Sequence, residues 1–545
     1  MNRFLPSKVT LEGKFALLSL FALALIIRAA CAIYFSGKID AEGAEYASIA
    51  RHLLSGDGYT GIVSRGPETV FPPLYPFLIA LVGYVTGDTE IAGRTINIVA
   101  GAILVFPVFW IASQMFSRTE GLIAATLVAI HPLLVRYSIT VHCESTFLTL
   151  ALLAVSSAML AAKKPSNENL ALAGLLYGLT YLVRPEGIIY MALGTVYFYF
   201  ATADSLKDPR SRISKAAIIP LFFLILGLPY IIWLSIHAGG LRIEGKTPLN
   251  MAVQLRQMAG EPYFDAQYAM DDNLVPHGVF MIPHEDALRL FHFGIVDYIM
   301  LLKAKAIYVA QNAAAFVAGG LKFGSPALFV LAITGFFGQS RSRQAALDRI
   351  YLFLILAFAT FGTFFIYYTD ERFYLIFIPV FCIFAAGGLS RLTLWARDVT
   401  SVLGGGTRLQ SLTSGSAAAS ILALVLLPSL ALTRRDFLEE LQTRPVKAFA
   451  ERLQSDGGVP HIADTTPTLA FHASATFVKF PYSSEETAIK YFRKRGVNFV
   501  VLRGSAIDMR PYIKKWLASG VPDAVQIADL STPSDKILIY KLSNP

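Results

Sequence analysis

Long runs of apolar residues recur along this chain of 545 residues. A run of roughly 17 to 25 mainly apolar residues can cross a bilayer as a helix and exceeds what a soluble core helix needs. Only 16% of the residues are charged, where an ordinary soluble domain has roughly 25%. The pattern predicts a polytopic α-helical membrane protein with about eleven spans. These predicted spans cover residues 15–35, 92–113, 119–136, 145–162, 170–184, 187–203, 216–237, 321–338, 350–368, 373–390 and 417–433.

Lysine and arginine gather in the short loops on one side of these runs. The positive-inside rule therefore predicts a cytoplasmic N-terminus and a C-terminus on the outer side. The short outer domain and compact size favour a bacterial inner (plasma) membrane, with the C-terminal domain in the periplasm. The formal net charge of +9 follows from this topology and does not indicate nucleic acid binding. Two long loops, 36–91 and 238–320, then lie outside and can cover a cavity.

The predicted organisation has a membrane module at 1–433 and a soluble α/β domain at 434–545. The first apolar run is longer than the core of a signal peptide, so we expect a retained anchor. Within the soluble domain we expect a capping box at Ser483-Ser484-Glu485-Glu486 that opens a helix running to Arg495, a strand at 498–502, a helix at 511–519 and a strand at 536–540. The glycine- and serine-rich segment 402–416 is predicted to be a flexible linker.

Neither the cysteines nor the spacing of possible metal ligands indicates a disulfide or a metal site. Cys31, Cys143 and Cys382 are the only cysteines, and they form no CxxC pair. No disulfide, metal site or required cofactor is predicted, although outer carboxylates are ligands that a divalent ion accepts.

The first outer loop begins with Asp40, Glu42 and Glu45 ahead of Tyr46. At helical spacing Glu42 lies on the same face as Tyr46, which turns its carboxylate toward the membrane body. A structural explanation is open as well: Asp40 as the helix N-cap and Glu42 as a first-turn acid that the helix dipole favours.

Further polar residues occur at the outer ends of spans. They are His142 and Glu144 before one span, Arg184-Pro185-Glu186 between two spans, Arg372 before another, and Arg94 and Arg136. Ionisable groups at such depth are costly and usually line a cavity or pair with a partner. An arginine fork suits phosphate, although local salt bridges and snorkelling explain single arginines equally well.

Several short segments resemble the GT-C superfamily of polyprenyl-phosphate-sugar glycosyltransferases, in the branch of the protein mannosyltransferases and the lipid A aminoarabinose transferase. The segments, over most of the chain, are Glu42-Gly43-Ala44-Glu45-Tyr46, Pro72-Pro73-Leu74-Tyr75-Pro76, Arg94, Glu144, Arg184-Pro185-Glu186-Gly187 and Arg372-Phe373-Tyr374-Leu375. The chain departs from the family at two positions: Glu42 stands where many members have aspartate, and Phe71 stands where the lipid A branch has lysine. The second departure argues against a lipid A acceptor.

The resemblance implies an inverting, single-step glycosyltransferase. In that mechanism Glu42 is the general base, with Asp40 as its rival, and Glu144 holds the sugar or the acceptor. Arg372, with Arg184 or Arg94, binds the donor phosphate. Tyr46, Tyr75, His142 and Glu186 are further candidate substrate-binding residues.

The implied partners are a polyprenyl-phosphate-linked sugar and a lipid, glycan or protein acceptor. A transporter or flippase of a lipid-linked sugar is the main alternative, and an inactive envelope scaffold is a weaker one. Transporters show internal repeats and broken spans, of which the sequence gives no clear sign, and the acids lie at the rim of the bilayer. Neither sugar nor acceptor is encoded in a short motif.

Overall fold

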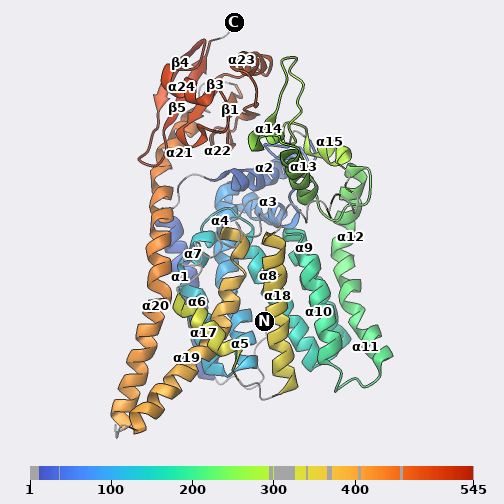
Figure 1. Ribbon diagram of the computed structural model, residues 1–545, viewed down its shortest axis with the longest axis vertical. Coiled ribbons are helices and arrows are strands. Elements are labelled where there is room, and N and C mark those ends of the chain that lie inside the picture. Colours follow the sequence, from blue (N-terminus) through green and yellow to red (C-terminus); the bar gives the residue numbers. More distant parts are fainter. Residues whose placement is uncertain are drawn as a thin grey trace.

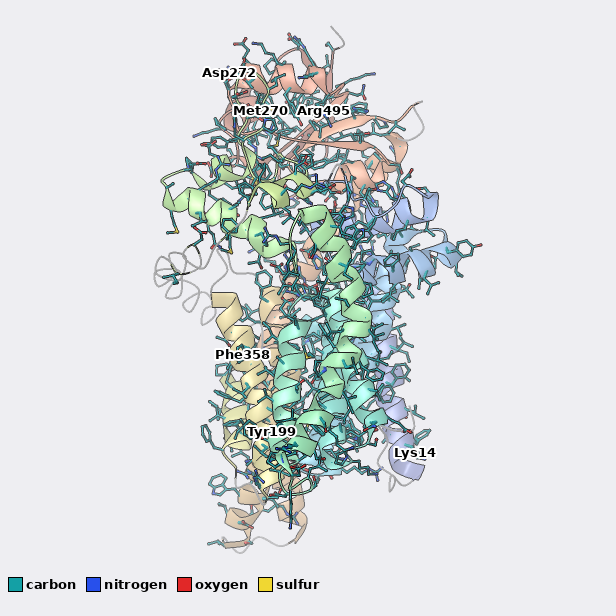
Figure 2. All side chains as sticks on the ribbon, turned by 90° about the vertical axis from the view of Figure 1, so that its right-hand side faces the viewer. Lys14, Tyr199, Met270, Asp272, Phe358 and Arg495 are labelled. Carbon is teal, nitrogen blue, oxygen red and sulfur yellow. The ribbon has the colours of Figure 1, made fainter. Side chains whose placement is uncertain are left out.

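A computed structural model describes residues 11–35, 37, 39–64, 66–291, 293, 297, 299, 326–338, 342–364, 371–402, 407–453 and 458–543. In it, a tall helical bundle carries a small α/β domain at one end (Figure 1). Lys14 lies toward the opposite end of the molecule from Arg495, as the predicted sidedness requires (Figure 2).

Each of the predicted spans falls on a helix or a pair of consecutive helices. They are α1 (Leu11–Phe35), α4 (Thr89–Ile103) with α5 (Val105–Met115), α6 (Arg118–Ile130) with α7 (Pro132–Ser138), α8 (Glu144–Lys163), α9 (Asn167–Val183), α10 (Gly187–Ala201), α11 (Pro209–Ala216) with α12 (Ile218–Ala238), α17 (Pro326–Phe336), α18 (Arg343–Phe364), α19 (Phe377–Val402) and α20 (Thr407–Gln442). Parts of two predicted spans, 321–325 and 365–368, lie outside the described residues.

Length and hydropathy by themselves select fewer spans. Among the described residues five helices are long and apolar enough to cross a membrane, or up to six if the bent pair α6 and α7 is one span. This pair bends by 56° at His131, directly before Pro132, and proline cannot supply the backbone N–H that would continue the helix. The other predicted spans include helices too short to pass this test, such as α10 and α17.

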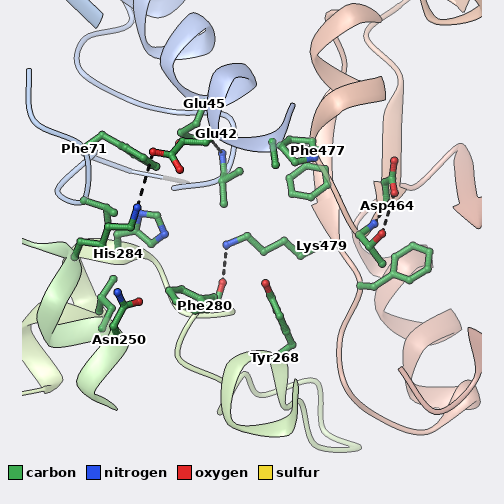
Figure 3. Close-up of a pocket in the computed structure, with 18 of the residues that line it drawn as sticks. Glu42, Glu45, Phe71, Asn250, Tyr268, Phe280, His284, Asp464, Phe477 and Lys479 are labelled. Carbon is green, nitrogen blue, oxygen red and sulfur yellow. Dashed lines mark hydrogen bonds and ion pairs between the residues drawn. The ribbon is translucent and has the colours of Figure 1, made fainter. Parts of the chain in front are cut away.

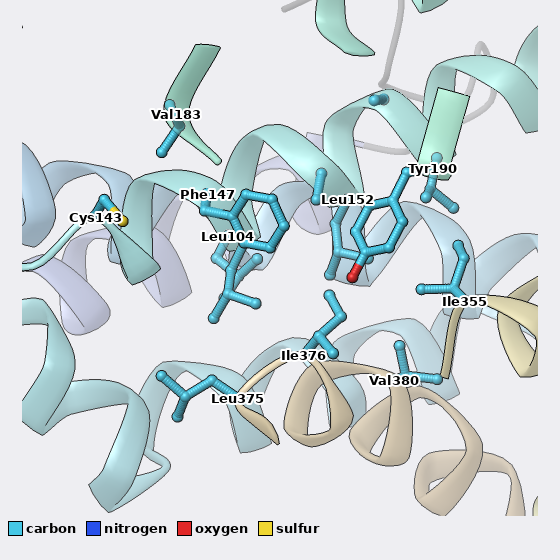
Figure 4. Close-up of a cluster of buried hydrophobic side chains, with 14 of the residues drawn as sticks. Leu104, Cys143, Phe147, Leu152, Val183, Tyr190, Ile355, Leu375, Ile376 and Val380 are labelled. Atoms are coloured by element: carbon cyan, nitrogen blue, oxygen red, sulfur yellow. The ribbon is translucent and has the colours of Figure 1, made fainter. Parts of the chain in front are cut away.

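Small residues bring the spans together. A Cβ on Gly335 of α17 would lie 1.8 Å from the backbone oxygen of Phe384 in α19, and one on Gly388 would lie 2.1 Å from that of Leu331. Such close approach is how helices gain packing contacts where lipid provides no hydrophobic drive. The bundle core near its outer end includes Phe147, Tyr190 and Ile376, which come from three segments distant in sequence (Figure 4).

The predicted linker at 402–416 is wrong from residue 407 onward, because α20 begins at Thr407 and continues to Gln442. Serine and glycine weaken a helix by up to about 1 kcal/mol each, but extending an existing helix is much easier than starting one. The apolar run that follows therefore carries the helix through this segment. Residues 403–406 lie outside the described part of the chain.

The C-terminal domain is built on a five-stranded sheet in the order β2-β1-β3-β5-β4. Its strands are β1 (His461–Asp464), β2 (Thr476–Lys479), β3 (Phe499–Arg503), β4 (Ala524–Asp529) and β5 (Ile537–Leu542), and its helices include α21 (Arg444–Leu453), α22 (Thr468–His472), α23 (Glu485–Lys494) and α24 (Ile513–Ser519). β1 pairs in parallel with β2 and β3, whereas β5 pairs antiparallel with β3 and β4. The two strands and two helices expected here are present, and the Ser484 hydroxyl caps α23 by accepting from the Thr487 N–H at 3.2 Å.

The two predicted outer loops supply short helices between the bundle and the sheet. They are α2 (Ala41–Ser55), α3 (Leu74–Thr86), α13 (Lys246–Met258), α14 (Tyr263–Tyr268) and α15 (His284–Leu290). In Figure 1 these helices form a layer beneath the domain. Two of these helices, α2 and α13, line the cavity in which several candidate residues meet.

Candidate active site

A cavity of about 470 Å³ lies at the end of the bundle nearest the C-terminal domain (Figure 1). Six of the predicted site residues line it, namely Glu42, Tyr46, Glu144, Arg184, Glu186 and Arg372. Its remaining wall is largely apolar and includes Phe147, Ile188, Ile189, Phe358 and Ile376. The cavity therefore combines charged residues at one end with an apolar wall.

Glu42 reaches the cavity because of how α2 begins. Asp40 is the N-cap, and its Oδ1 accepts from the Gly43 N–H at 2.7 Å. Gly43 lets the helix approach the segment before α8, since a Cβ there would lie 2.7 Å from the Val141 carbonyl oxygen. The structural explanation for Asp40 is thus correct, and Glu42 is left facing the cavity.

Two cations face the Glu42 carboxylate. Its Oε2 accepts a hydrogen bond from Arg372, and its Oε1 lies 3.9 Å from the Lys246 ammonium. The side chain is 16% exposed. Burial opposes its ionisation, but Arg372 and Lys246 outweigh this effect and hold the pKa of Glu42 well below its usual range. Glu42 is therefore ionised at neutral pH, and its charge is neutralised mainly by Arg372.

Arg184 connects two further acids at the tight turn between α9 and α10. Its Nη1 donates to Glu144 at 3.1 Å and its Nη2 to Glu186 at 2.7 Å. The turn is close because a Cβ on Gly187 would lie 2.3 Å from the Tyr181 nitrogen. The salt bridge expected between Arg184 and Glu186 is present, and Glu144, only 3% exposed, is its buried second partner.

Four predicted residues lie outside the cavity lining: Asp40, His142, Tyr75 and Arg94. Asp40 and His142 contact each other. Burial works against a charged His142, but Asp40 outweighs it and raises the pKa of His142 to about 9. The Tyr75 hydroxyl accepts from Asn97 at 2.8 Å and its ring packs edge-on against Tyr46, so Tyr75 supports a lining residue rather than lining the cavity itself.

Arg94 is engaged within the protein rather than at the cavity. Its Nη2 lies 2.9 Å from Glu90 and its Nη1 donates to the Ile139 carbonyl at 2.6 Å. Arg136 lies 3.7 Å from Asp436 of α20. Both arginines thus tie helices together, the structural role that the sequence left open.

Sequence reasoning missed Lys246, which starts α13 and extends over the Phe71 ring at 5.4 Å. In the sequence only its position in a predicted outer loop pointed to Lys246, because a single lysine belongs to no motif with a characteristic spacing. Among the described residues no group of three or more His, Cys, Asp or Glu side chains could hold a metal ion.

The arrangement defines a class: a helical membrane protein with a carboxylate and arginines in a partly apolar cavity, which residues of α2 and α13 also line. Residues 70–233 match the family described as dolichyl-phosphate-mannose-protein mannosyltransferase. No curated protein matches the chain by sequence.

Solved structures resemble the chain along nearly all its length. The archaeal oligosaccharyltransferase AglB from Archaeoglobus fulgidus, in complex with an inhibitory peptide and a dolichol-phosphate, has 14% identity and a TM-score of 0.59, covering 98% of this chain and 75% of its own. ArnT from Cupriavidus metallidurans, bound to undecaprenyl phosphate, has 11% identity and a TM-score of 0.54, covering 96% and 97%. At such identities the likeness shows the fold. The chain therefore has the GT-C type of fold over nearly its whole length, and residues 70–233 are similar to the protein mannosyltransferase family.

Proposed function

We propose that the protein is a membrane glycosyltransferase that moves a sugar from a polyprenyl-phosphate donor to an acceptor hydroxyl at the outer face of the membrane. The observation that carries this proposal is the contact between Glu42 and Arg372 in a cavity that also holds Arg184. One space thus contains a base and the cations that a phosphate leaving group needs. AglB and ArnT were solved with dolichol-phosphate and undecaprenyl phosphate, respectively, which supports a donor of this class.

The cavity suits the two halves of such a donor. The apolar residues that line it, such as Ile188 and Ile376, can pack against the start of a polyprenyl chain. Arg372 can bind the phosphate oxygens, where negative charge grows as the sugar leaves. Arg184 is the second candidate, although it already contacts Glu144 and Glu186.

The Glu42–Arg372 ion pair implies that the donor binds before Glu42 accepts a proton. While paired, Glu42 is a weak base, since a nearby positive charge lowers the proton affinity of a carboxylate. A donor phosphate competes for Arg372 and thereby raises the basicity of Glu42. The acceptor oxygen then attacks the anomeric carbon, the bond from that carbon to the phosphate oxygen breaks, and the acceptor proton moves to Glu42. Attack opposite the leaving phosphate inverts the anomeric carbon in one step.

We further propose that the C-terminal domain lies outside the cell or in the periplasm and the N-terminus in the cytoplasm, because the basic loops lie at the end of the bundle away from the domain. This mechanism is derived from side chains alone. Activity after metal removal with a chelator tests whether a divalent ion is required as well.

Mass spectrometry of envelope glycans and lipid-linked sugars from a deletion strain tests the function. We expect one glycan to lose a sugar, its polyprenyl-phosphate donor to persist, and only the wild-type gene, not Glu42→Gln, to restore the pattern. A transporter would instead leave the donor on the wrong side of the membrane, and its activity would not require Glu42. Restoration by Glu42→Gln would remove Glu42 from the mechanism.

A further inference from the structure

One short helix of the C-terminal domain, α22, lies against α2, the helix that carries Glu42 (Figure 1). The segment that leads from β1 into α22 includes Asp464 and Pro467, which line a second cavity, of about 270 Å³, together with Glu42 (Figure 3). The C-terminal domain and the proposed base therefore face each other across one space. The contacts between α22 and α2 decide how firmly the base is held there.

Phe471 of α22 inserts into the core of the membrane bundle. Its side chain is 2% exposed and belongs to the same buried cluster as Ala44 and Ala47 of α2. Among the described residues of the C-terminal domain, Phe471 alone belongs to this cluster. A buried aromatic ring is one of the largest stabilising contributions that a single side chain makes, so Phe471 anchors α22 in the bundle.

Arg51, near the C-terminal end of α2, binds the same turn of chain. Its Nη1 donates to the Phe471 carbonyl and to the Ser474 hydroxyl, both at 3.3 Å, and its guanidinium lies 4.3 Å from the centre of the Phe471 ring. Ser474 has a φ of 46°, in the left-handed region where a residue other than glycine is strained. A serine at this position gives Arg51 an acceptor that glycine would lack.

His472 binds the chain directly before α2. Its Nε2 accepts from the Ile39 N–H at 3.4 Å, and its Nδ1 lies 3.7 Å from a carboxylate oxygen of Glu90. Burial lowers the pKa of His472 to about 4, although Glu90 opposes this effect, so the ring is neutral at neutral pH and Nε2 can accept a hydrogen bond. Ile39 precedes Asp40, the N-cap of α2. The contacts of α22 therefore reach both ends of α2.

The segment before α22 is firmly joined to the sheet. The Asp464 carboxylate at the end of β1 accepts from the Thr465 N–H at 2.6 Å and from Arg503 of β3 at 2.9 and 2.7 Å. Both Asp464 and Arg503 are buried. A shift of the C-terminal domain is therefore passed on to α2 through α22, because the connection between β1 and α22 cannot easily absorb it.

We propose that α22 is a clamp that positions the base: through His472 and Arg51 it holds both ends of α2, and thereby keeps the Glu42 carboxylate against Arg372. His472 and Arg51 are positioning residues, since neither lines either cavity. A displacement of about 1 Å at a reacting group can lower a rate about 100-fold, so the seating of the C-terminal domain on the bundle controls transfer. This proposal rests on the glycosyl transfer proposed above.

Two variants loosen the clamp by different means. His472→Phe keeps a ring and loses the acceptor for Ile39, and Arg51→Met keeps an unbranched side chain and loses both hydrogen bonds. A Glu42 carboxylate that is held less firmly competes less well for Arg372, so we expect each variant to bind undecaprenyl phosphate at least about threefold more tightly than the wild type. The lost charge of Arg51 would by itself weaken anion binding, so tighter binding identifies a movement of α2.

The same titration in the Glu42→Gln background separates positioning from general damage. Without an ionised carboxylate at position 42 the clamp has no competitor to hold, so His472→Phe and Arg51→Met should add no further tightening there. Unchanged or weaker phosphate binding in both clamp variants, or equal tightening with and without Glu42, overturns the proposal.

His461→Phe and Arg493→Met are the matched controls. Each loses a contact inside the C-terminal domain, His461 with the Arg495 carbonyl and Arg493 with Asp523. Both should leave phosphate affinity unchanged, because neither contact reaches α2. Tightening in these controls equal to that in the clamp variants overturns the proposal, since any loosening of the domain would then have the same effect.

Hydrogen exchange of the purified full-length protein, measured by mass spectrometry, gives a second readout that needs no substrate. We expect the amides of α2 to exchange faster in both clamp variants than in the wild type and the controls, because a helix with fewer tertiary contacts opens more often. Unchanged exchange in α2 overturns the proposal. If the wild type binds no undecaprenyl phosphate, the donor assignment at Arg372 fails, and the exchange measurement still decides the clamp.

Discussion

Glu42 and Arg372 lie 330 positions apart in the sequence and meet in an ion pair at the end of the bundle nearest the C-terminal domain. The pair joins the proposed base to the proposed phosphate-binding cation. Each neutralises the other while the donor is absent, so substrate binding and base strength are coupled. The first two predictions test the roles of Glu42 and Arg372 individually.

Glu42→Gln should lower glycosyl transfer by at least about 100-fold, the usual contribution of a positioned general base. The same change should tighten undecaprenyl phosphate binding, because the phosphate then binds Arg372 without displacing an ionised carboxylate. Transfer is measured by mass spectrometry of products and affinity by titration of the purified protein. Asp57→Asn, an exposed acid just beyond α2, is the control. Weaker phosphate binding in Glu42→Gln would contradict the competition described here.

Arg372→Ala should weaken undecaprenyl phosphate binding about 10- to 150-fold, which corresponds to losing a charged hydrogen bond worth roughly 1.5–3 kcal/mol. Arg372→Lys should recover part of this loss, since lysine keeps the charge but not the fork. Arg435→Ala, whose side chain is 82% exposed beside Glu439, is the matched control. If Arg372→Ala binds the phosphate as the wild type does, the donor site lies elsewhere.

Arg94→Ala should lower stability with little change in donor affinity. It leaves Glu90, 5% exposed, without its nearest cation, and breaking a buried pair costs about 3–5 kcal/mol. Lys447 lies 3.0 Å from the other oxygen of Glu90, which places the expected loss at the lower end. A thermal unfolding scan in detergent measures the loss, and a phosphate titration shows whether binding is retained. A fully stable variant with weakened phosphate binding would restore Arg94 to the donor site.

The His142–Asp40 pair should make stability depend on pH. Because the pKa of His142 is raised from 6.5 to about 9 in the folded protein, its stabilising contribution is complete below about 6.5 and is lost as the pH rises through about 9. We expect the melting temperature of the wild type to fall more between pH 6.5 and pH 10 than that of His142→Gln. If the melting temperatures of the two proteins change with pH in the same way, His142 is not charged in the folded protein.

The sequence by itself determined that most of the chain lies in lipid. Apolar runs such as 216–237 have no other stable environment than lipid, and the turn at Arg184-Pro185-Glu186 follows from local chemistry. The motif around Glu42 also marked the helix that carries the proposed base. Periodicity and local rules decide such features because they depend on neighbours in sequence.

Tertiary structure alone decided which of the outer charges share a cavity. Arg94 and Arg372 look alike in sequence, yet one packs against Glu90 within the protein and the other faces Glu42. Lys246 has no signature in the sequence, and residues of the C-terminal domain line a cavity with Glu42 only because α20 carries the domain above α2 (Figure 1). The physical reason is that an ion pair depends on distance in space, and residues hundreds of positions apart set that distance through the packing of whole helices.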